Sequence, residues 1–188
     1  MGFFFKASVK ELLQVRNKIF LEFGLPTLYD KEFQKSPFST AWFGKSEIGY
    51  TYELCRVSEK EELEVITVQI VRGDRWIQIS LNVFILQPSL VSLKQLTDLD
   101  GLKFHLPPNS ISNMRLRMDD VKGPNVLDYN FLFRNHNLKS FHTKSGLAKR
   151  AEQLGKIIKQ DMKNIDSFIA RWHEIYKPLT TTWQGEKL

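Results

Sequence analysis

The sequence predicts an α+β protein: an antiparallel β-meander of about five or six strands, with an N-terminal helix and a long C-terminal helix packed on one face. Three stretches lead to this prediction. Residues 63–86 alternate apolar and polar, whereas residues 8–23 and 144–176 repeat their apolar positions at helical spacing. Sequential strands joined by short loops usually pair, and two amphipathic helices would cover the apolar side of such a sheet.

Residues 63–86 predict one long β-hairpin. The alternation runs through both sides of Gly73-Asp74, and a two-residue loop that begins with Gly fits a tight hairpin turn. This turn sets a register in which Val68 faces Ile79. One face of the hairpin then carries only aliphatic side chains, namely Ile66, Val68, Ile70, Ile77, Ile79, Leu81, Val83 and Ile85.

The opposite face of the hairpin is more polar. It carries Val65, Thr67, Gln69 and Val71 on one strand and Trp76, Gln78, Ser80 and Asn82 on the other. If no helix covers it, this face is an aromatic and polar platform suited to a peptide, a protein or stacked bases. The alternative is that the loops around residues 100 or 130 cover it, which would make Trp76 part of a secondary core.

The first helix is predicted from residue 8 to residue 23. Ser8 and Glu11 form a capping box, and Arg16 is the single polar residue within the apolar stripe. Gly24 is expected to end the helix in the left-handed conformation, and Pro26 to prevent its continuation.

The remaining patterns predict shorter elements and a closing helix. They indicate strands at 38–43 and 48–57, a charged loop at 58–62, a short helix at 89–99 capped by Ser89, strands at 111–118 and 127–134, and a turn at 122–125. The closing helix covers 144–176, with Gly155 and Lys163-Asn164 as places where it bends or divides. We expect a single domain over residues 1–178 and a polar, frayed tail over 179–188.

Composition narrows the possible functions. Cys55 is the only cysteine, so no internal disulfide can form, and the short apolar run at residues 3–5 ends at Lys6. Neither a signal peptide nor a membrane span is predicted, which favours a cytoplasmic protein that does not bind membranes. The net charge of +6 makes nucleic acid a possible partner, although such a charge also serves solubility.

No motif predicts a cofactor, a metal or a catalytic residue. Gly44-Lys45-Ser46 resembles the end of a P-loop but lacks the first glycine. Asp120-Val121-Lys122, with Asp98 or Asp100, has the spacing found in metal-dependent nucleases, yet it also fits a solvated turn. His105, His136, His142 and His173 lack the spacing of a zinc-binding helix.

The function predicted from sequence is that of a non-catalytic intracellular binding module that recognises a protein partner through an exposed sheet face. The alternatives are a basic nucleic-acid-binding domain and, less favoured, a metal-dependent nuclease that uses Asp120 and Lys122. The candidate partner-binding residues are Arg72, Arg75, Trp76, Gln78, Lys149, Arg150, Lys156, Lys159 and Lys163.

Overall fold

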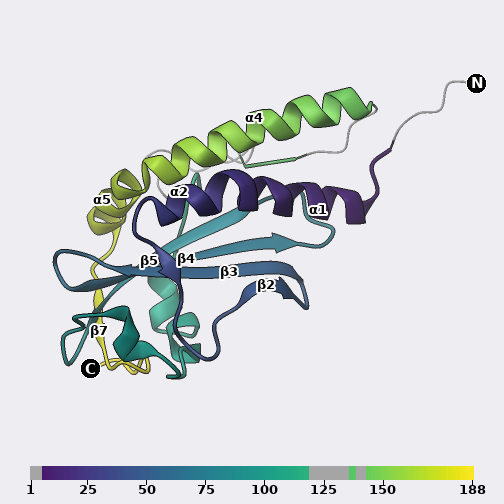
Figure 1. Ribbon diagram of the computed structural model, residues 1–188. Coiled ribbons are helices and arrows are strands. Elements are labelled where there is room, and N and C mark those ends of the chain that lie inside the picture. Colours follow the sequence, from purple (N-terminus) through teal and green to yellow (C-terminus); the bar gives the residue numbers. More distant parts are fainter. Residues whose placement is uncertain (1–5, 119–135, 139–142) are drawn as a thin grey trace, which may run out of the picture.

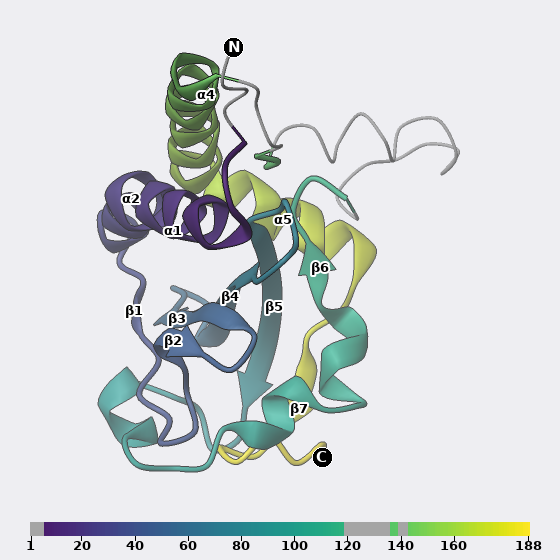
Figure 2. The same cartoon turned by 90° about the vertical axis from the view of Figure 1, so that its right-hand side faces the viewer.

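A computed structural model describes residues 6–118, 136–138 and 143–188. An antiparallel sheet separates two layers, with the long helices on one side and short helical turns and the C-terminal segment on the other (Figures 1 and 2). The α+β class, the N-terminal helix and the long C-terminal helix are therefore confirmed.

The sheet is built around the predicted meander. Its strands are β1 (Gln34–Lys35), β2 (Phe43–Ser46), β3 (Gly49–Val57), β4 (Glu62–Val71), β5 (Gln78–Leu86), β6 (Met114–Arg115) and β7 (Leu179–Thr181). Strands β3, β4 and β5 are neighbours in the order β1-β3-β4-β5-β6, while β2 pairs with β3 and β7 pairs in parallel with β5. The predicted register is confirmed, because Val68 lies opposite Ile79.

The tip of the hairpin differs from the prediction. The pairing of β4 with β5 ends at Gln69 and Gln78, and Trp76 forms a β-bridge with Asn137 instead. The N–H of Ile77 donates to the carbonyl oxygen of His136 at 3.0 Å. The tip therefore opens before Gly73-Asp74, because a segment distant in sequence takes up its backbone hydrogen bonds.

The N-terminal helix begins as predicted but continues beyond its expected end. It comprises α1 (Val9–Ile19), the π-helical turn η1 (Phe20–Gly24) and α2 (Leu25–Tyr29). The capping box is present, with the Ser8 hydroxyl accepting from the N–H of Glu11 at 3.2 Å. The N–H of Leu25 bonds to the carbonyl oxygen of Phe20, five residues back, and this wider turn lets the chain continue through Pro26.

Gly24 has a different role from the predicted one. Its φ of −82° is right-handed, so it is not a left-handed C-cap. A Cβ at this position would lie 2.6 Å from the ring of Phe20 and 3.0 Å from Ile158 on α4. Glycine is therefore required by the close approach of two helices rather than by a turn.

The C-terminal helix divides at one of the two predicted places. α4 (Lys144–Lys163) and α5 (Ile165–Ile175) meet at Asn164. Gly155 lies inside α4, where the ring of Phe23 would be 2.7 Å from an added Cβ. Both helices and α1 bury the aliphatic face of the meander; of the eight predicted aliphatic residues only Ile85 is substantially exposed, at 38%.

A smaller layer covers part of the opposite face. It contains the 3₁₀ turns η2 (Leu93–Leu96), η3 (Leu102–His105) and η4 (Asn109–Ser112). The helix predicted at 89–99 is reduced to η2, whose cap is Ser92 rather than Ser89. The apolar residues buried beneath this layer are Phe38, Cys55, Leu63, Phe84, Leu86, Leu90, Leu96 and Phe104.

Three further strand and tail predictions need correction. The strand expected at 38–43 begins only at Phe43, and the one expected at 111–118 is reduced to β6, the edge partner of β5. Residues 179–188 do not fray: β7 pairs with β5, and the indole N–H of Trp183 donates to the carbonyl oxygen of Pro88 at 2.6 Å. The turn and strand predicted at 122–125 and 127–134 lie outside the described residues.

Cys55 is buried in the apolar cluster beneath the 3₁₀ turns. Burial raises the pKa of its thiol to about 12. Along the described part of the chain, none of the helices combines the length and apolar character that crossing a bilayer requires.

Candidate functional site

The described residues cover the polar sheet face only in part. The apolar cluster under η2 and η3 covers the end of the face near Leu63, but Thr67 and Gln69 remain half-buried. They face a hollow of about 320 Å³, which we call the sheet-face hollow. It is lined by Thr40, Trp42, Ser46, Glu47, Ile48, Thr51, Glu53, Thr67, Gln69, Leu102 and His105.

The floor of the hollow follows directly from strand alternation. In β3, Thr51 and Glu53 point away from the helices, because alternate residues of a strand face opposite sides. In the antiparallel register Thr51 pairs with Gln69, and Glu53 pairs with Thr67. Four polar side chains are thereby placed side by side on two central strands, which gives the floor a rigid backbone.

Large apolar side chains stand at the rim. Trp42 is 48% exposed, Ile48 44% and Leu102 51%. The backbone of each takes part in a hydrogen bond: the carbonyl oxygen of Trp42 accepts from Glu53 at 2.9 Å, that of Ile48 accepts from Arg72 at 2.8 Å, and the N–H of Leu102 donates to Asp100 at 2.8 Å. The rim therefore consists of exposed apolar side chains on a backbone that is fixed by hydrogen bonds.

The carboxylate of Glu53 is the unusual group in this wall. Its side chain is only 8% exposed, and its Oε2 lies 3.3 Å from Nε2 of His105, whose side chain is 39% exposed. Among the described residues, no hydrogen bond and no other ion pair reaches this carboxylate. Glu47 also lines the hollow, so the site carries acidic groups in a chain whose net charge is +6.

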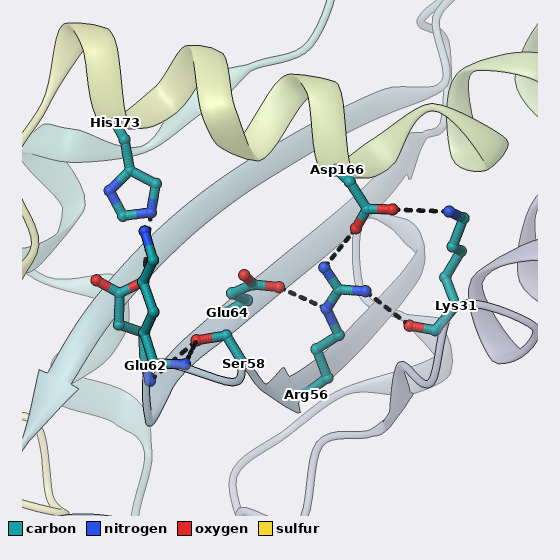
Figure 3. A network of polar contacts seen from close by, with 8 residues as sticks. Lys31, Arg56, Ser58, Glu62, Glu64, Asp166 and His173 are labelled. Carbon is teal, nitrogen blue, oxygen red and sulfur yellow. Dashed lines mark hydrogen bonds and ion pairs between the residues drawn. The ribbon is translucent and has the colours of Figure 1, made fainter.

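A second polar region lies on the other side of the sheet, between α5 and the strands (Figure 3). Arg56 is at its centre, with Nε 2.5 Å from Oε2 of Glu64, Nη2 2.6 Å from Oδ1 of Asp166 and Nη1 2.9 Å from the carbonyl oxygen of Lys31. The guanidinium also stacks 4.6 Å above the ring of Phe33. Every nitrogen of Arg56 has a partner, so this network fastens α5 to β3 and β4.

Burial dominates the electrostatics of Glu64, the buried carboxylate of this network. It raises the pKa of Glu64, and the hydrogen bond and charge of Arg56 offset only part of that effect. A cavity of about 430 Å³ adjoins the network, with Glu62 and His173 in its wall, 3.3 Å apart. Acidic and basic groups share this wall, and we interpret it as a structural ion-pair region. Within residues 6–118, 136–138 and 143–188, no group of three or more His, Cys, Asp or Glu side chains is placed to hold a metal ion.

The predicted platform residues are only partly brought together. Gln69 and Thr67 lie in the hollow, but Trp76 is half-buried beside Asn137 and does not line it. Gln78 donates to Asp74 at 2.8 Å near the hairpin tip, where Arg72 and Arg75 are exposed. The aromatic residue at the hollow is Trp42, which lies in the strand predicted at 38–43, to which the sequence assigned no function.

The predicted basic residues of α4 form a separate surface. Lys149, Lys156 and Lys163 recur every seven residues, so they share one exposed side of the helix. Lys159 is also exposed, whereas Arg150 turns inward and donates to the carbonyl oxygen of Asn137 at 3.4 Å. The structure does not place these lysines at the sheet-face hollow.

The other residues considered for catalysis or metal binding have structural roles or lie outside the described residues. Asp120, Lys122 and His142 are not among the described residues. His136 is buried, with Nε2 2.7 Å from Oδ2 of Asp161. Asp100 accepts hydrogen bonds from Thr40 and from the N–H of Leu102, which holds the loop beside the hollow.

The fold and this site define an α+β protein whose polar sheet face is only partly covered by the residues that the structure describes. No family model matches the sequence, and no curated protein or solved structure matches it significantly. The functional argument therefore depends on the geometry of the site.

Proposed function

We propose that this chain is a non-catalytic binding module that holds a segment of a partner protein in the sheet-face hollow. The observation that carries the proposal is the sheet-face hollow, which has a polar floor and, among the described residues, Trp42, Ile48 and Leu102 exposed at its rim. Tryptophan is enriched at protein interfaces, where apolar anchors commonly surround or meet polar groups that fix orientation. The single buried thiol is compatible with a cytoplasmic site of action.

The floor has the chemistry needed to orient a peptide. Thr67 and Gln69 offer hydroxyl and amide groups that can both donate and accept hydrogen bonds. Because both lie on the central strand β4, a bound segment would meet a surface that does not have to be ordered on binding. Preorganisation of this kind lowers the entropic cost of association.

A peptide selection tests the proposal. Random peptides displayed on phage are selected against the full chain, and the affinities of enriched peptides are measured by fluorescence anisotropy. Thr67→Arg fills the hollow and Trp42→Ala removes an anchor, so each is expected to weaken binding at least tenfold. Gln153→Arg, at an exposed position on α4, introduces the same charge elsewhere and is expected to leave binding unchanged. Peptides that bind Thr67→Arg and Trp42→Ala as well as the original chain would refute the proposal.

Nucleic-acid binding is the second candidate because of the lysines on α4. Lys149, Lys156 and Lys163 are spaced by about 10 Å along the helix, at about 1.5 Å per residue. Nucleic-acid binding ranks second for two reasons. Lys156 already forms an ion pair with Glu152 at 2.7 Å, and the exposed Arg72 and Arg75 lie at the hairpin tip rather than on α4 with the lysines.

Anisotropy with labelled DNA and RNA over a salt series tests this second candidate. Phosphate contacts release counterions, so the logarithm of the affinity should fall linearly with the logarithm of the salt concentration. Replacing Lys149, Lys156 and Lys163 by Glu should then reduce both the affinity and the slope. The absence of DNA and RNA binding even at low salt would exclude this second candidate function.

A further inference from the structure

We infer that the sheet-face hollow selects a cationic side chain, the ammonium of a lysine or the guanidinium of an arginine, and that Glu53 is the residue that binds it. This inference rests on the function proposed above and names the chemistry of the partner segment. It goes beyond that function by naming the side chain that the partner inserts. An apolar rim alone would favour an apolar side chain of the partner.

The first step is the incomplete pairing of Glu53. Removing an ionised carboxylate from water is costly unless a cation or several hydrogen-bond donors replace the lost hydration. Glu53 is more than nine-tenths buried, yet among the described residues its side chain has one ionic neighbour, His105, at 3.3 Å. A histidine supplies a positive charge only when it is protonated, so His105 is a less complete partner for this carboxylate than a lysine or an arginine would be.

Two of the other buried acids, Glu64 and Asp161, show what complete pairing is like in this protein. Glu64 accepts from Arg56 at 2.5 Å, and Asp161 accepts from Arg117 at 3.0 Å and contacts His136 at 2.7 Å. Glu62 has only a histidine at 3.3 Å, as Glu53 does, but Arg56 and Lys60 line the same cavity. In the sheet-face hollow, the described lining contains no lysine or arginine.

The second step is charge complementarity. The lining contributes Glu47 and Glu53 and, as its sole basic side chain among the described residues, His105. The remainder of the chain is strongly basic, with a net charge of +6. An acidic hollow in a basic protein attracts a cation locally and disfavours an acidic peptide at the same place.

The third step is the shape of the guest. Lysine and arginine carry an apolar stem that ends in a charged head. In the hollow, the stem would lie along Trp42 and Leu102, the head would meet Glu53, and the oxygen atoms of Thr51 and Gln69 would accept further hydrogen bonds. The exposed indole of Trp42 offers the guest cation an additional attraction through its π face.

His105 occupies the position opposite Glu53 when no partner is bound. Its side chain is partly exposed and belongs to the short turn η3, so it can leave the carboxylate at little cost. The guest cation would take the place of His105, because both groups would contact the same carboxylate of Glu53.

The experiment uses peptides selected against the full chain. In each peptide that binds the hollow, the lysines and arginines are replaced one at a time, lysine by norleucine and arginine by citrulline. Both substitutes are neutral and similar in shape to the residues they replace. We expect one of these single replacements to weaken binding at least tenfold. Glu53→Gln should weaken the unmodified peptide to a similar extent, and the two changes together should cost little more than either alone.

The outcomes separate this inference from the proposed function. Peptides that lose affinity for Thr67→Arg, and of which one neutral analogue binds the original chain at least tenfold more weakly, support both the proposed function and this inference. Peptides that lose affinity for Thr67→Arg but are indifferent to Glu53→Gln and to neutral analogues overturn the inference and leave the proposed function standing. A selection that gives no peptide sensitive to Thr67→Arg overturns both. The peptide-side replacement keeps the test valid if Glu53→Gln alters folding.

Discussion

The guanidinium of Arg16 donates a 2.9 Å hydrogen bond to the carbonyl oxygen of Trp76, 60 residues further along the chain. The same side chain donates to the carbonyl oxygen of Val71 at 3.1 Å and to that of Leu12, in its own helix, at 3.2 Å. Arg16 is completely buried, and burial lowers the pKa of its guanidinium although the charge of Asp74 acts in the opposite direction. A buried helix residue thus holds both sides of the opened hairpin tip.

Replacing Arg16 should therefore destabilise the protein strongly. Arg16→Met keeps most of the volume but leaves the carbonyl oxygens of Val71 and Trp76 without their donor, and we expect a loss of about 3 kcal/mol in the free energy of unfolding. Arg16→Lys should recover little, because one ammonium lacks the planar fork that reaches several carbonyl groups. Urea denaturation measures both variants. An Arg16→Met protein as stable as the original would contradict this role.

Gly24→Ala distinguishes helix propensity from packing. Propensity alone predicts a gain of about 1 kcal/mol, because alanine is the better helix former. The structure predicts the opposite sign, a loss of about 1–3 kcal/mol, since the added methyl group would lie 2.6 Å from the buried ring of Phe20. Thermal and urea unfolding give the sign directly. Ala148→Gly, at an exposed position in α4, is the control and should destabilise by propensity alone.

Two glutamate-to-glutamine changes should have opposite effects on stability. Glu64→Gln removes the carboxylate that receives the Arg56 hydrogen bond, and we expect it to cost about 1–3 kcal/mol. Glu53→Gln replaces a buried carboxyl group that has one ionic neighbour among the described residues, so the variant should be as stable as the original or more stable. Melting temperatures of the two variants measured side by side test this contrast. A large loss of stability in Glu53→Gln would show that the carboxylate is already well satisfied.

The stabilising effect of Asp161 should depend on pH. Burial raises the pKa of this carboxyl, but hydrogen bonds and charges from His136 and Arg117 lower it more, and its net pKa lies below the ordinary value. A lowered native pKa stabilises the fold above the unfolded-state pKa, and this contribution disappears as the pH falls through the native value. Asp161→Asn should thus cost about 3 kcal/mol at pH 7 and progressively less below about pH 4.

Urea denaturation of Asp161→Asn over this pH range makes the comparison. Glu59→Gln, at an exposed position, is the control and should change stability little at any pH. A cost for Asp161→Asn that is the same at pH 7 and pH 3 would indicate that packing, rather than charge, accounts for it.

The sheet was predictable because its signal is local and repeated. A one-residue slip would send Val68 and Ile79 to the polar face, so the alternation and the burial of one face determine the register together. The end of the first helix was not predictable from local rules. Pro26 indicates a stop, whereas the π turn at Phe20–Gly24 lets the chain continue into α2, and no local sequence rule indicates that turn.

The site was predictable only in part, for a similar reason. Thr67 and Gln69 lie on the polar face that strand alternation identified. Trp42, Glu53 and His105 reach the same place because β2 pairs with β3 and η3 lies beside the hollow, and the position of η3 has no sequence signal. Trp76 was assigned to the platform because the tip was treated as a closed hairpin, whereas Asn137 pairs with it.

The most direct test of the central claim is an NMR titration of the ¹⁵N-labelled full chain with a selected lysine- or arginine-containing peptide. The account predicts that backbone amide shifts concentrate at Thr51, Glu53, Thr67 and Gln69, and that the neutral analogue of the peptide produces much smaller shifts at the same concentration. Shifts concentrated on the lysines of α4 or around Arg56, with the floor of the hollow unaffected, would contradict it.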